Sequence, residues 1–277
     1  MYKPNDYIKL NQYDENQVIW RYMNFEKFIS LLQNKALFFS TCFNMQKLDP
    51  FEGYYTKINL DELKDEKGNN IRYNQHAKGK PQEYRKIFLK NTFINCWHLN
   101  DNENSAMWNI YAPGTNGLVI KSTIKCLEKS FKNKNNEEYI GNIEYKDYYL
   151  SCIKFDAKKY VEDITRLAEQ QVNINTDKAI ILTELKKYYY PLIMSKRKEY
   201  KFENEIRVVS PFIHNNDKNC IKDYGKFIKV DLETLISEII ISPCADGWYV
   251  DLIKDVSRKY NLKCKIYKSK LYEKFDN

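Results

Sequence analysis

The stretch KFENEIRVVS, residues 201–210, alternates charged with uncharged side chains. Glu203, Glu205 and Arg207 stand two residues apart, and the apolar Ile206 separates the last two. Because successive side chains of a β-strand point to opposite faces, this spacing predicts a strand with two carboxylates and a guanidinium on one face. Either that face is exposed to solvent and Arg207 neutralises one carboxylate, or the charged residues take part in a reaction. The residues alone leave both readings open.

Similar patterns predict the other strands and helices. Two-residue alternation and short apolar runs indicate strands, and apolar residues three or four apart indicate helices. Strands are expected at 17–23, 36–41, 92–99, 118–122, 138–145, 205–210, 227–232, 238–243 and 263–268. Helices are expected at 24–34 with Asn24 as the cap, and at about 82–90, 157–172, 177–195 and 249–260. A further brief helix is expected to begin with Ser105 as the cap and to end at Pro113 and Gly114. This irregular order predicts an α+β fold with a mixed, mainly antiparallel sheet and peripheral helices.

The composition limits the classes of protein to which the chain can belong. The chain has 277 residues, of which 43% are hydrophobic and 30% charged, as is typical of a globular protein. No linker divides the sequence, so we expect a single domain over 1–277, with a helical insertion at about 157–196 and a basic C-terminal tail. The net charge is +8, and the densest basic runs, at 194–201 and 263–274, are expected to form a solvated cationic surface. Such a surface permits weak attraction to phosphate groups.

The seven cysteines are scattered singly, without a CxxC pair, which is typical of reduced thiols in a cytoplasmic protein. The three histidines give no zinc-binding spacing, so no metal site is expected. The N-terminal segment lacks the apolar core of a signal peptide, and no run approaches the length of a membrane span. These features predict a bacterial cytoplasmic protein without a membrane partner.

Arg21 is the first candidate for a functional site. It lies on the predicted strand 17–23, whose two faces are both largely apolar, so its side chain is expected to be partly buried. A buried guanidinium needs a carboxylate or a ligand anion, because its desolvation is otherwise uncompensated. An ion pair with Glu52 or Glu205 and an anion-binding role are both open.

The end of the second predicted strand carries further candidates. Ser40 and Thr41 end this strand, where their hydroxyls can hold the next loop by bonding to nearby backbone groups. The sequence DPFE, residues 49–52, then forms a rigid turn that includes the carboxylates of Asp49 and Glu52. The more usual role of Asp49 in such a sequence is to stabilise the turn through its side chain.

An aromatic pair on a short helix is the last candidate. Trp108 and Tyr111 are three residues apart and therefore share one helical face. Aromatic side chains dominate core burial, so a stripe of this kind usually belongs to the core. The alternative is a platform on which a planar ring stacks.

Six segments occur in an order that resembles one bacterial family. They are WRYM (20–23), LFFSTCFNMQKLDPFEG (37–53), FINCWHL (93–99), MWNIYAPGTNGLVI (107–120), YKFENEIRVV (200–209) and ISEIIISP (236–243). Across residues 18–265 the chain resembles the family called domain of unknown function 2971, which is itself distantly similar to ADP-ribosyltransferases. The resemblance implies a split-sheet fold and NAD as the substrate, cleaved between nicotinamide and ribose through an oxocarbenium-like transition state.

The resemblance also implies roles for residues of this sequence. Glu205 would be the catalytic carboxylate, Glu203 would assist the acceptor nucleophile, and Arg21 would clamp a phosphate of NAD. The implied cofactor-binding residues are Arg21, Tyr22, Ser40, Thr41, Trp108 and Tyr111, with Asp49, Glu52 and Arg207 as supporting residues. Two features depart from the pattern: Cys42 stands third in a Ser-Thr-Ser triplet, and the turn 49–52 is not part of the usual signature.

Three functions are open. The leading prediction is an NAD-consuming enzyme, an ADP-ribosyltransferase or NAD glycohydrolase that transfers ADP-ribose to protein, nucleic acid or water, in the role of a toxin or phage-defence effector. The second is a magnesium-dependent nuclease that uses Asp49, Glu52, Glu203 and Glu205 as oxygen ligands. The third is a non-catalytic binding module on the same fold.

Overall fold

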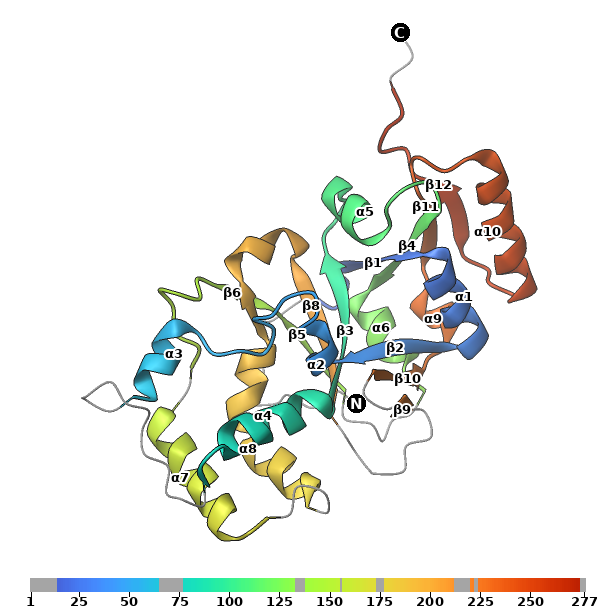
Figure 1. Cartoon of the computed structure of the whole chain (residues 1–277). Coiled ribbons are helices and arrows are strands. Elements are labelled where there is room, and N and C mark those ends of the chain that lie inside the picture. The colour runs from blue at the N-terminus through green and yellow to red at the C-terminus, as the bar shows by residue number, and fades with distance from the viewer. Residues whose placement is uncertain are drawn as a thin grey trace.

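A branched β-sheet runs through the computed structural model of the chain, which describes residues 14–64, 77–132, 138–154, 156–172, 177–211, 220–221 and 224–274 (Figure 1). Ten strands in these ranges belong to the sheet, and eight of them follow one path from edge to edge. In spatial order these eight are β12 (Lys265–Lys268), β11 (Glu238–Ile241), β4 (Gly117–Thr123), β1 (Val18–Asn24), β3 (Thr92–Leu99), β2 (Ala36–Thr41), β10 (Gly225–Lys229) and β9 (Cys220–Ile221).

The sheet branches at β3. One edge of β3 pairs with β8 (Glu205–Pro211), which pairs in turn with β5 (Tyr139–Asn142). The other edge of β3 is shared, because β1 pairs with its C-terminal end and β2 with its N-terminal end. In the β3–β8 register His98 lies opposite Glu205, and Cys96 lies opposite Arg207. Three strands that are distant in the sequence therefore meet around β3.

The strand directions confirm the α+β prediction with a mixed, mainly antiparallel sheet. All the pairings in the large sheet are antiparallel except β11 with β12, which run parallel. A separate small parallel pair joins β6 (Glu144–Lys146) and β7 (Ser195–Arg197). The expected long strand at 138–145 is thus divided between β5 and β6, which lie in different sheets.

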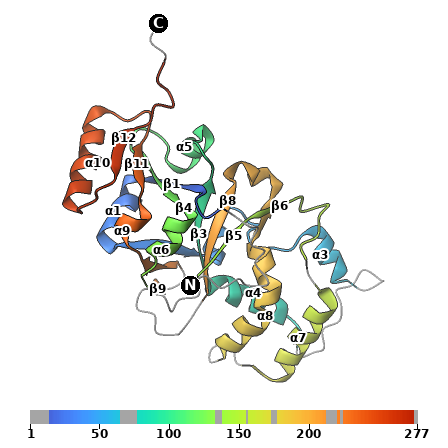
Figure 2. The same ribbon diagram turned by 180° about the vertical axis from the view of Figure 1, so that it is seen from behind.

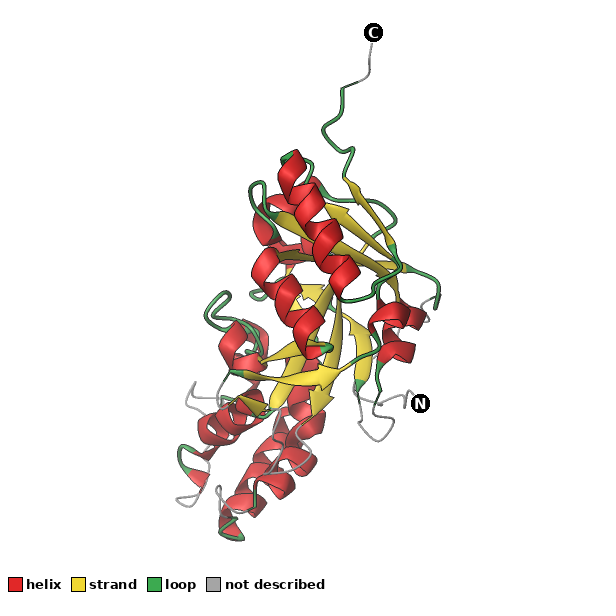
Figure 3. Ribbon diagram, turned by 90° about the vertical axis from the view of Figure 1, so that its right-hand side faces the viewer, coloured by secondary structure: helices red, strands yellow, loops and turns green. Residues whose placement is uncertain are grey.

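The helices surround the sheet in two groups, as Figures 1 and 2 show. The group beside β11 and β12 consists of α1 (Phe25–Asn34), α6 (Ile124–Ser130), α9 (Leu232–Leu235) and α10 (Gly247–Lys259). The group beyond β5 and β8 contains α3 (Lys57–Glu62), α4 (Lys80–Lys90), α7 (Ala157–Glu169) and α8 (Lys178–Ile193). The shorter elements are α2 (Cys42–Met45), α5 (Ser105–Tyr111) and the 3₁₀ helix η2 (Lys198–Glu203). Figure 3 shows helices lying against the sheet in the upper half of the view and gathered at its lower end.

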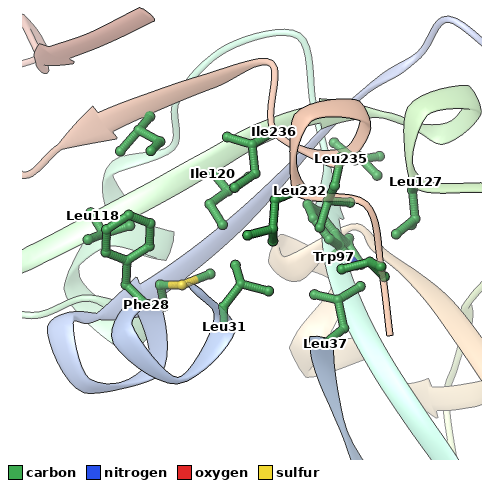
Figure 4. Packing of buried hydrophobic residues seen from close by; sticks show 14 of the residues in the cluster. Phe28, Leu31, Leu37, Trp97, Leu118, Ile120, Leu127, Leu232, Leu235 and Ile236 are labelled. Atoms are coloured by element: carbon green, nitrogen blue, oxygen red, sulfur yellow. The ribbon is translucent and has the colours of Figure 1, made fainter. Parts of the chain in front are cut away.

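The main hydrophobic core lies between the sheet and the first group of helices. Phe28 and Leu31 of α1 point toward the same interior as Trp97 of β3 and Leu235 of α9 (Figure 4). A second core is formed by α4, α7 and α8, and a smaller third core lies beneath α5. Successive side chains of β1 point to opposite faces and therefore pack in two of these cores. Ile19 packs in the first core, and the side chains next to it on the strand pack in the third.

Two local predictions were wrong, and both errors have a backbone reason. Glu203 was expected to share a strand with Glu205, but it ends η2, and Asn204 adopts a left-handed conformation with φ 38° before β8 begins. Asparagine tolerates this conformation better than most residues, so it ends the helical turn. The helix α5 is capped by Asn104 and not by Ser105, since the Asn104 side chain accepts from the backbone N–H groups of Ala106 and Met107. The predicted cap Asn24 is confirmed.

The helices α7 and α8 occupy the segment that was expected to be a helical insertion, while the division of the chain into domains stays a prediction. Six cysteines in the described ranges are free thiols. Nowhere in those ranges is a helix both long enough and apolar enough to cross a membrane.

Candidate active site

A pocket of about 570 Å³ opens where β1, β2, β3 and β8 converge. Arg21, Ser40 and Glu205 come from three different strands, and all three line it. Such a volume is typical of sites that hold small molecules or cofactors. The candidate residues on its wall are Arg21, Tyr22, Ser40, Asp49, Glu52, Tyr111, Glu203 and Glu205.

Five side chains at the pocket form a row in which negative and positive charges alternate, called here the charge chain. Arg207 donates from Nη1 to Glu52 Oε1 at 2.6 Å and from Nε to Glu205 Oε1 at 2.7 Å. Lys196 Nζ lies 3.5 Å from Glu205 Oε2 and also donates to Glu203 Oε2. All five side chains are buried. Three carboxylates and two cations, when ionised, leave one net negative charge at this place in the pocket.

Burial contradicts the reading in which the charges of 201–210 are merely solvated. Glu203 is 4% exposed and Glu205 is 6% exposed. Only Glu205 and Arg207 lie on the strand, so the prediction that Glu203 shares their strand face was wrong. The turn at Asn204 nevertheless returns the Glu203 carboxylate to the same ammonium that Glu205 contacts. The expectation that Arg207 neutralises one carboxylate is confirmed for Glu205.

The two carboxylates have pKa values that are shifted in opposite directions. Burial raises the pKa of Glu203 above its ordinary value, although Lys196 opposes the shift. Burial alone would also raise the pKa of Glu205, but Arg207 and Lys196 outweigh it and lower that pKa to about 2. Environments that separate the pKa values of paired carboxylates often give them different tasks. Glu205 is therefore an anion at neutral pH, and Glu203 is the member of the pair that exchanges a proton more readily.

Tyr111 ties the short helix α5 to this pair. Its hydroxyl donates to Glu203 Oε1 at 2.6 Å. Burial and the neighbouring Glu203 raise the pKa of Tyr111, so the hydroxyl remains a donor throughout the neutral range. Glu203 is held from the other side as well, because its backbone oxygen lies 2.5 Å from His98 Nδ1.

Arg21 provides an isolated positive charge on the pocket wall. Its Nη1 donates to Asn95 Oδ1 at 3.1 Å and to the carbonyl oxygen of Cys96 at 2.6 Å. The guanidinium also lies 5.8 Å from the centre of a Trp97 ring. No carboxylate of the described residues lies within ion-pairing distance of Arg21, so of the two alternatives the ion pair with Glu52 or Glu205 is absent there. A guanidinium held by neutral acceptors at a pocket wall suits an anionic ligand.

Three candidate residues lie behind the pocket wall. Thr41 is buried and caps α2 by accepting from the backbone N–H of Asn44. Trp108 is buried, and its ring meets the Tyr22 ring edge-on with centroids 5.1 Å apart. Arg207 is fully buried. Trp108 therefore belongs to the core, as a stripe of this kind usually does, whereas Tyr22 and Tyr111 reach the pocket.

The turn 49–52 is part of the site architecture. The Asp49 side chain accepts from the backbone N–H of Phe51 at 3.0 Å, which confirms that it stabilises the turn. Asp49 also pairs with Arg197 Nη2 at 2.9 Å, and Glu52 pairs with Arg207. Two ion pairs thus fasten this turn to β7 and β8. Because Asp49 and Glu52 also line the pocket, the turn forms one side of it.

Sequence reasoning missed two residues that shape the pocket. Lys196 lies in the basic run 194–201, which was expected to be a solvated surface, yet it is 6% exposed and lines the pocket. Asn95 is buried, donates to the carbonyl oxygen of Phe38 at 2.8 Å and accepts from Arg21, so it links β1, β2 and β3. The position of the Asn95 amide in the middle of the largely apolar strand 92–99 could have indicated that this residue has a specific role. The sequence around Lys196 offers no such signal.

The carboxylates proposed for a magnesium site are already paired. Asp49, Glu52, Glu203 and Glu205 each contact a lysine or an arginine. In the described ranges no three or more His, Cys, Asp or Glu side chains are grouped so that they could hold a metal ion. Magnesium prefers several free oxygen ligands, so this donor set does not fit a magnesium-dependent nuclease.

Comparisons with known proteins agree with the resemblance found in the sequence. Residues 107–208 match the model of the family described as "Protein of unknown function (DUF2971)", which confirms the resemblance to that family over this span. The span includes the last five residues of α5 and the first four of β8, and so it carries Tyr111, Glu203 and Glu205. None of the curated proteins matches the chain.

Among solved structures, the chain is distantly similar to DarT of Thermus sp. 2.9. The structure of that protein in complex with carba-NAD+ is 10% identical, covers 93% of this chain and 98% of its own, and has a TM-score of 0.38. The complex with ADP-ribosylated ssDNA is 10% identical, covers 95% and 98%, and has a TM-score of 0.39. The complex with NAD+ is 8% identical, covers 94% and 98%, and has a TM-score of 0.39.

The buried ion pairs predict a large stability effect at Arg207. Replacement by methionine (Arg207→Met) leaves Glu52 and Glu205 without their shared cation, which should lower the free energy of unfolding by about 3–5 kcal/mol. The matched control is Arg258→Met, because Arg258 pairs with Asp255 on the surface and its side chain is 73% exposed. Urea unfolding followed by circular dichroism measures the free energy of unfolding of both variants. Equal stability of the two variants would contradict this account of the charge chain.

Proposed function

We propose that the chain cleaves the bond between nicotinamide and ribose in NAD and transfers the ADP-ribose group. One observation carries the proposal: a guanidinium free of carboxylate partners among the described residues shares a pocket with two buried carboxylates of opposite pKa shift. NAD requires both a cationic group and a carboxylate at its binding site. Its diphosphate is an anion, and its ribose becomes cationic when the bond to nicotinamide breaks.

Binding of NAD is assigned to the guanidinium and the aromatic wall. The planar fork of Arg21 suits a phosphate, and its Nε and Nη2 make no hydrogen bond to the described residues. Tyr22 and Tyr111 supply rings at the pocket wall against which the nicotinamide can lie. Ser40 lines the pocket from β2, and its hydroxyl accepts from the Asn44 side chain of α2 at 3.3 Å, so it braces that side.

Bond cleavage is assigned to Glu205. When the C1′–N bond breaks, its electron pair goes to the nicotinamide, which leaves as a neutral molecule, and positive charge develops on the ribose. Glu205 is an anion at neutral pH because Arg207 and Lys196 outweigh the effect of its burial on the pKa. A fixed, largely buried carboxylate stabilises that developing charge more than the same group would in solution. The net negative charge of the five side chains in the charge chain also stabilises positive charge on the ribose.

Transfer to the acceptor is assigned to Glu203. The acceptor oxygen or nitrogen forms a bond to C1′ and loses a proton, which the Glu203 carboxylate accepts. A carboxyl group with a raised pKa is suited to this work, since its basicity is closer to that of the medium. With water as the acceptor, the same steps give NAD hydrolysis.

A second groove supports a macromolecular acceptor. Its volume is about 540 Å³, and it shares Asn24, Glu26, Lys27 and Tyr111 with the pocket wall. Trp248 and Ile110 line this groove and are 59% and 50% exposed. Exposed aromatic rings stack on planar groups of nucleic acids or proteins. Modification of a nucleic acid or a protein in the same cell would suit a toxin or a phage-defence effector.

Nicotinamide release from NAD tests the proposal. Purified protein should release free nicotinamide, and Glu205→Gln should lower kcat by about 100-fold or more, as for the loss of one electrostatic stabiliser of a transition state. Arg21→Ala should raise KM for NAD, because the phosphate loses its partner. The matched control is Glu199→Gln, since Glu199 lies on η2 with Glu203 but is exposed.

The outcomes separate the remaining functions. If no nicotinamide is released with any acceptor and calorimetry detects no NAD binding, the proposal is wrong. NAD binding without release in the folded wild-type protein would favour the non-catalytic binding module.

The groove makes a separate prediction about the acceptor. Trp248→Ala should lower transfer of labelled ADP-ribose to single-stranded oligonucleotides or to cell proteins by about 5-fold or more, as expected from the loss of one stacking contact. Hydrolysis of NAD by water should be unchanged, because Trp248 lies outside the pocket. Tyr149→Ala is the control, since Tyr149 is 74% exposed and lines neither the pocket nor the groove. Equal losses of transfer and hydrolysis would contradict an acceptor role for the groove.

A further inference from the structure

Lys196 occupies the centre of the charge chain. It lies on β7, and its ammonium contacts the carboxylates of both Glu203 and Glu205. The ammonium also lies 4.6 Å from the centre of the Tyr200 ring, which holds it from a third side. A buried lysine with two carboxylate partners is fixed in position, and it lies at the wall of the pocket.

The ammonium does not act as a nucleophile in this setting. Burial alone would lower the pKa of Lys196, but Glu205 and Glu203 outweigh burial and raise it. The amine is therefore protonated at neutral pH, and a protonated amine has no electron pair with which to attack. The contacts that it makes connect it to the reaction through the two carboxylates.

The two carboxylates depend on Lys196 to different degrees. Glu205 keeps a second cation, because Arg207 donates to its other oxygen at 2.7 Å. In the described residues Glu203 has no cation other than Lys196, and its second oxygen accepts from the neutral hydroxyl of Tyr111. Without the ammonium, Glu203 would face the negative Glu205 across a buried gap. Loss of Lys196 therefore affects the charge of Glu203 more than that of Glu205.

We propose that Lys196 is a positioning residue that keeps Glu203 ionised beside Glu205, so that Glu203 can take a proton from the acceptor. Its catalytic meaning rests on the proposed function, but the charge state of Glu203 does not. The other titratable groups that face this pair are Arg207 of β8, Tyr111 of α5, His98 and Cys96 of β3, and Tyr145 of β6, and the Arg21 guanidinium of β1 acts on Glu205 at longer range. The fixed cations among them are Arg207 and Arg21, and both act on Glu205.

The consequence for the reaction is specific. The ammonium favours the carboxylate form of Glu203, and the proton lost by the acceptor passes to that carboxylate and then to solvent. When Lys196 is replaced by a neutral side chain, Glu203 holds a proton at higher pH and cannot accept another. Activity in neutral solution should then fall, while the intrinsic ability of Glu205 to stabilise the ribose cation is retained through Arg207.

Carboxyl titration by NMR tests this inference without any substrate. In protein labelled with ¹³C at the glutamate side chains, Lys196→Met should raise the titration midpoint of Glu203 by about one pH unit or more, as expected when an opposite charge within a few ångströms is removed. Lys196→Arg should restore most of the wild-type midpoint. Lys198→Met is the matched control, because Lys198 is two residues away and pairs with Asp147 on the surface.

A measurement on the wild-type protein covers the case in which Lys196→Met does not fold. The ¹⁵N chemical shift of the Lys196 ammonium should change with the titration midpoint of Glu203, since the two groups are in contact. A Lys196 signal that is insensitive to that titration, or an unchanged Glu203 midpoint in folded Lys196→Met, would overturn the inference.

Enzyme kinetics then distinguish the two proposals. If the wild-type protein releases nicotinamide, the acid limb of the kcat/KM profile for transfer should move to higher pH in Lys196→Met, in parallel with the NMR midpoint. Lys198→Met should leave the profile unchanged. If the wild-type protein releases no nicotinamide but the Glu203 midpoint still depends on Lys196, the proposed function fails while the inference about the charge of Glu203 stands.

Discussion

The burial of five alternating charges is the constraint on which the pocket depends. An ion removed from water must find an opposite charge in good geometry, or its desolvation destabilises the fold. In the order Glu52, Arg207, Glu205, Lys196 and Glu203, each member contacts the next. The members come from four segments of the chain, so the ion pairs fix how these segments meet. The positions of the Glu203 and Glu205 carboxylates are therefore a consequence of charge pairing and not of one strand's geometry.

The strand β3 makes this arrangement possible. It pairs with β8 along one edge and with both β1 and β2 along the other, so it brings Arg21, Ser40 and Glu205 to the same opening. Asn95 in its middle bonds to the neighbouring strands on the shared edge. The Arg21 guanidinium and the carboxylate pair thus line one pocket from different elements, and the proposed function uses the first for anion binding and the second for stabilisation of a cation.

Periodicity predicted most of the strands and helices, because they depend on local patterns of apolar residues. It failed at Glu203, where one asparagine in a left-handed conformation changes a strand into a helical turn. The ordered motifs pointed to Arg21, Ser40 and Glu205, which do share a pocket. Lys196 was beyond prediction, since a lysine in a basic run differs from a surface lysine only through the distant carboxylates that surround it. The pairing of Asp49 with Arg197 likewise depends on contacts far apart in the sequence.

An experimental structure of the protein in complex with carba-NAD+, an analogue of NAD, would test the account most directly. The account predicts that the diphosphate contacts the Arg21 guanidinium and that C1′ of the nicotinamide-bearing ring lies beside Glu205, with Glu203 facing the side from which an acceptor approaches. A ligand bound outside this pocket, or one whose diphosphate lies at Lys196 while Arg21 contacts nothing, would contradict it.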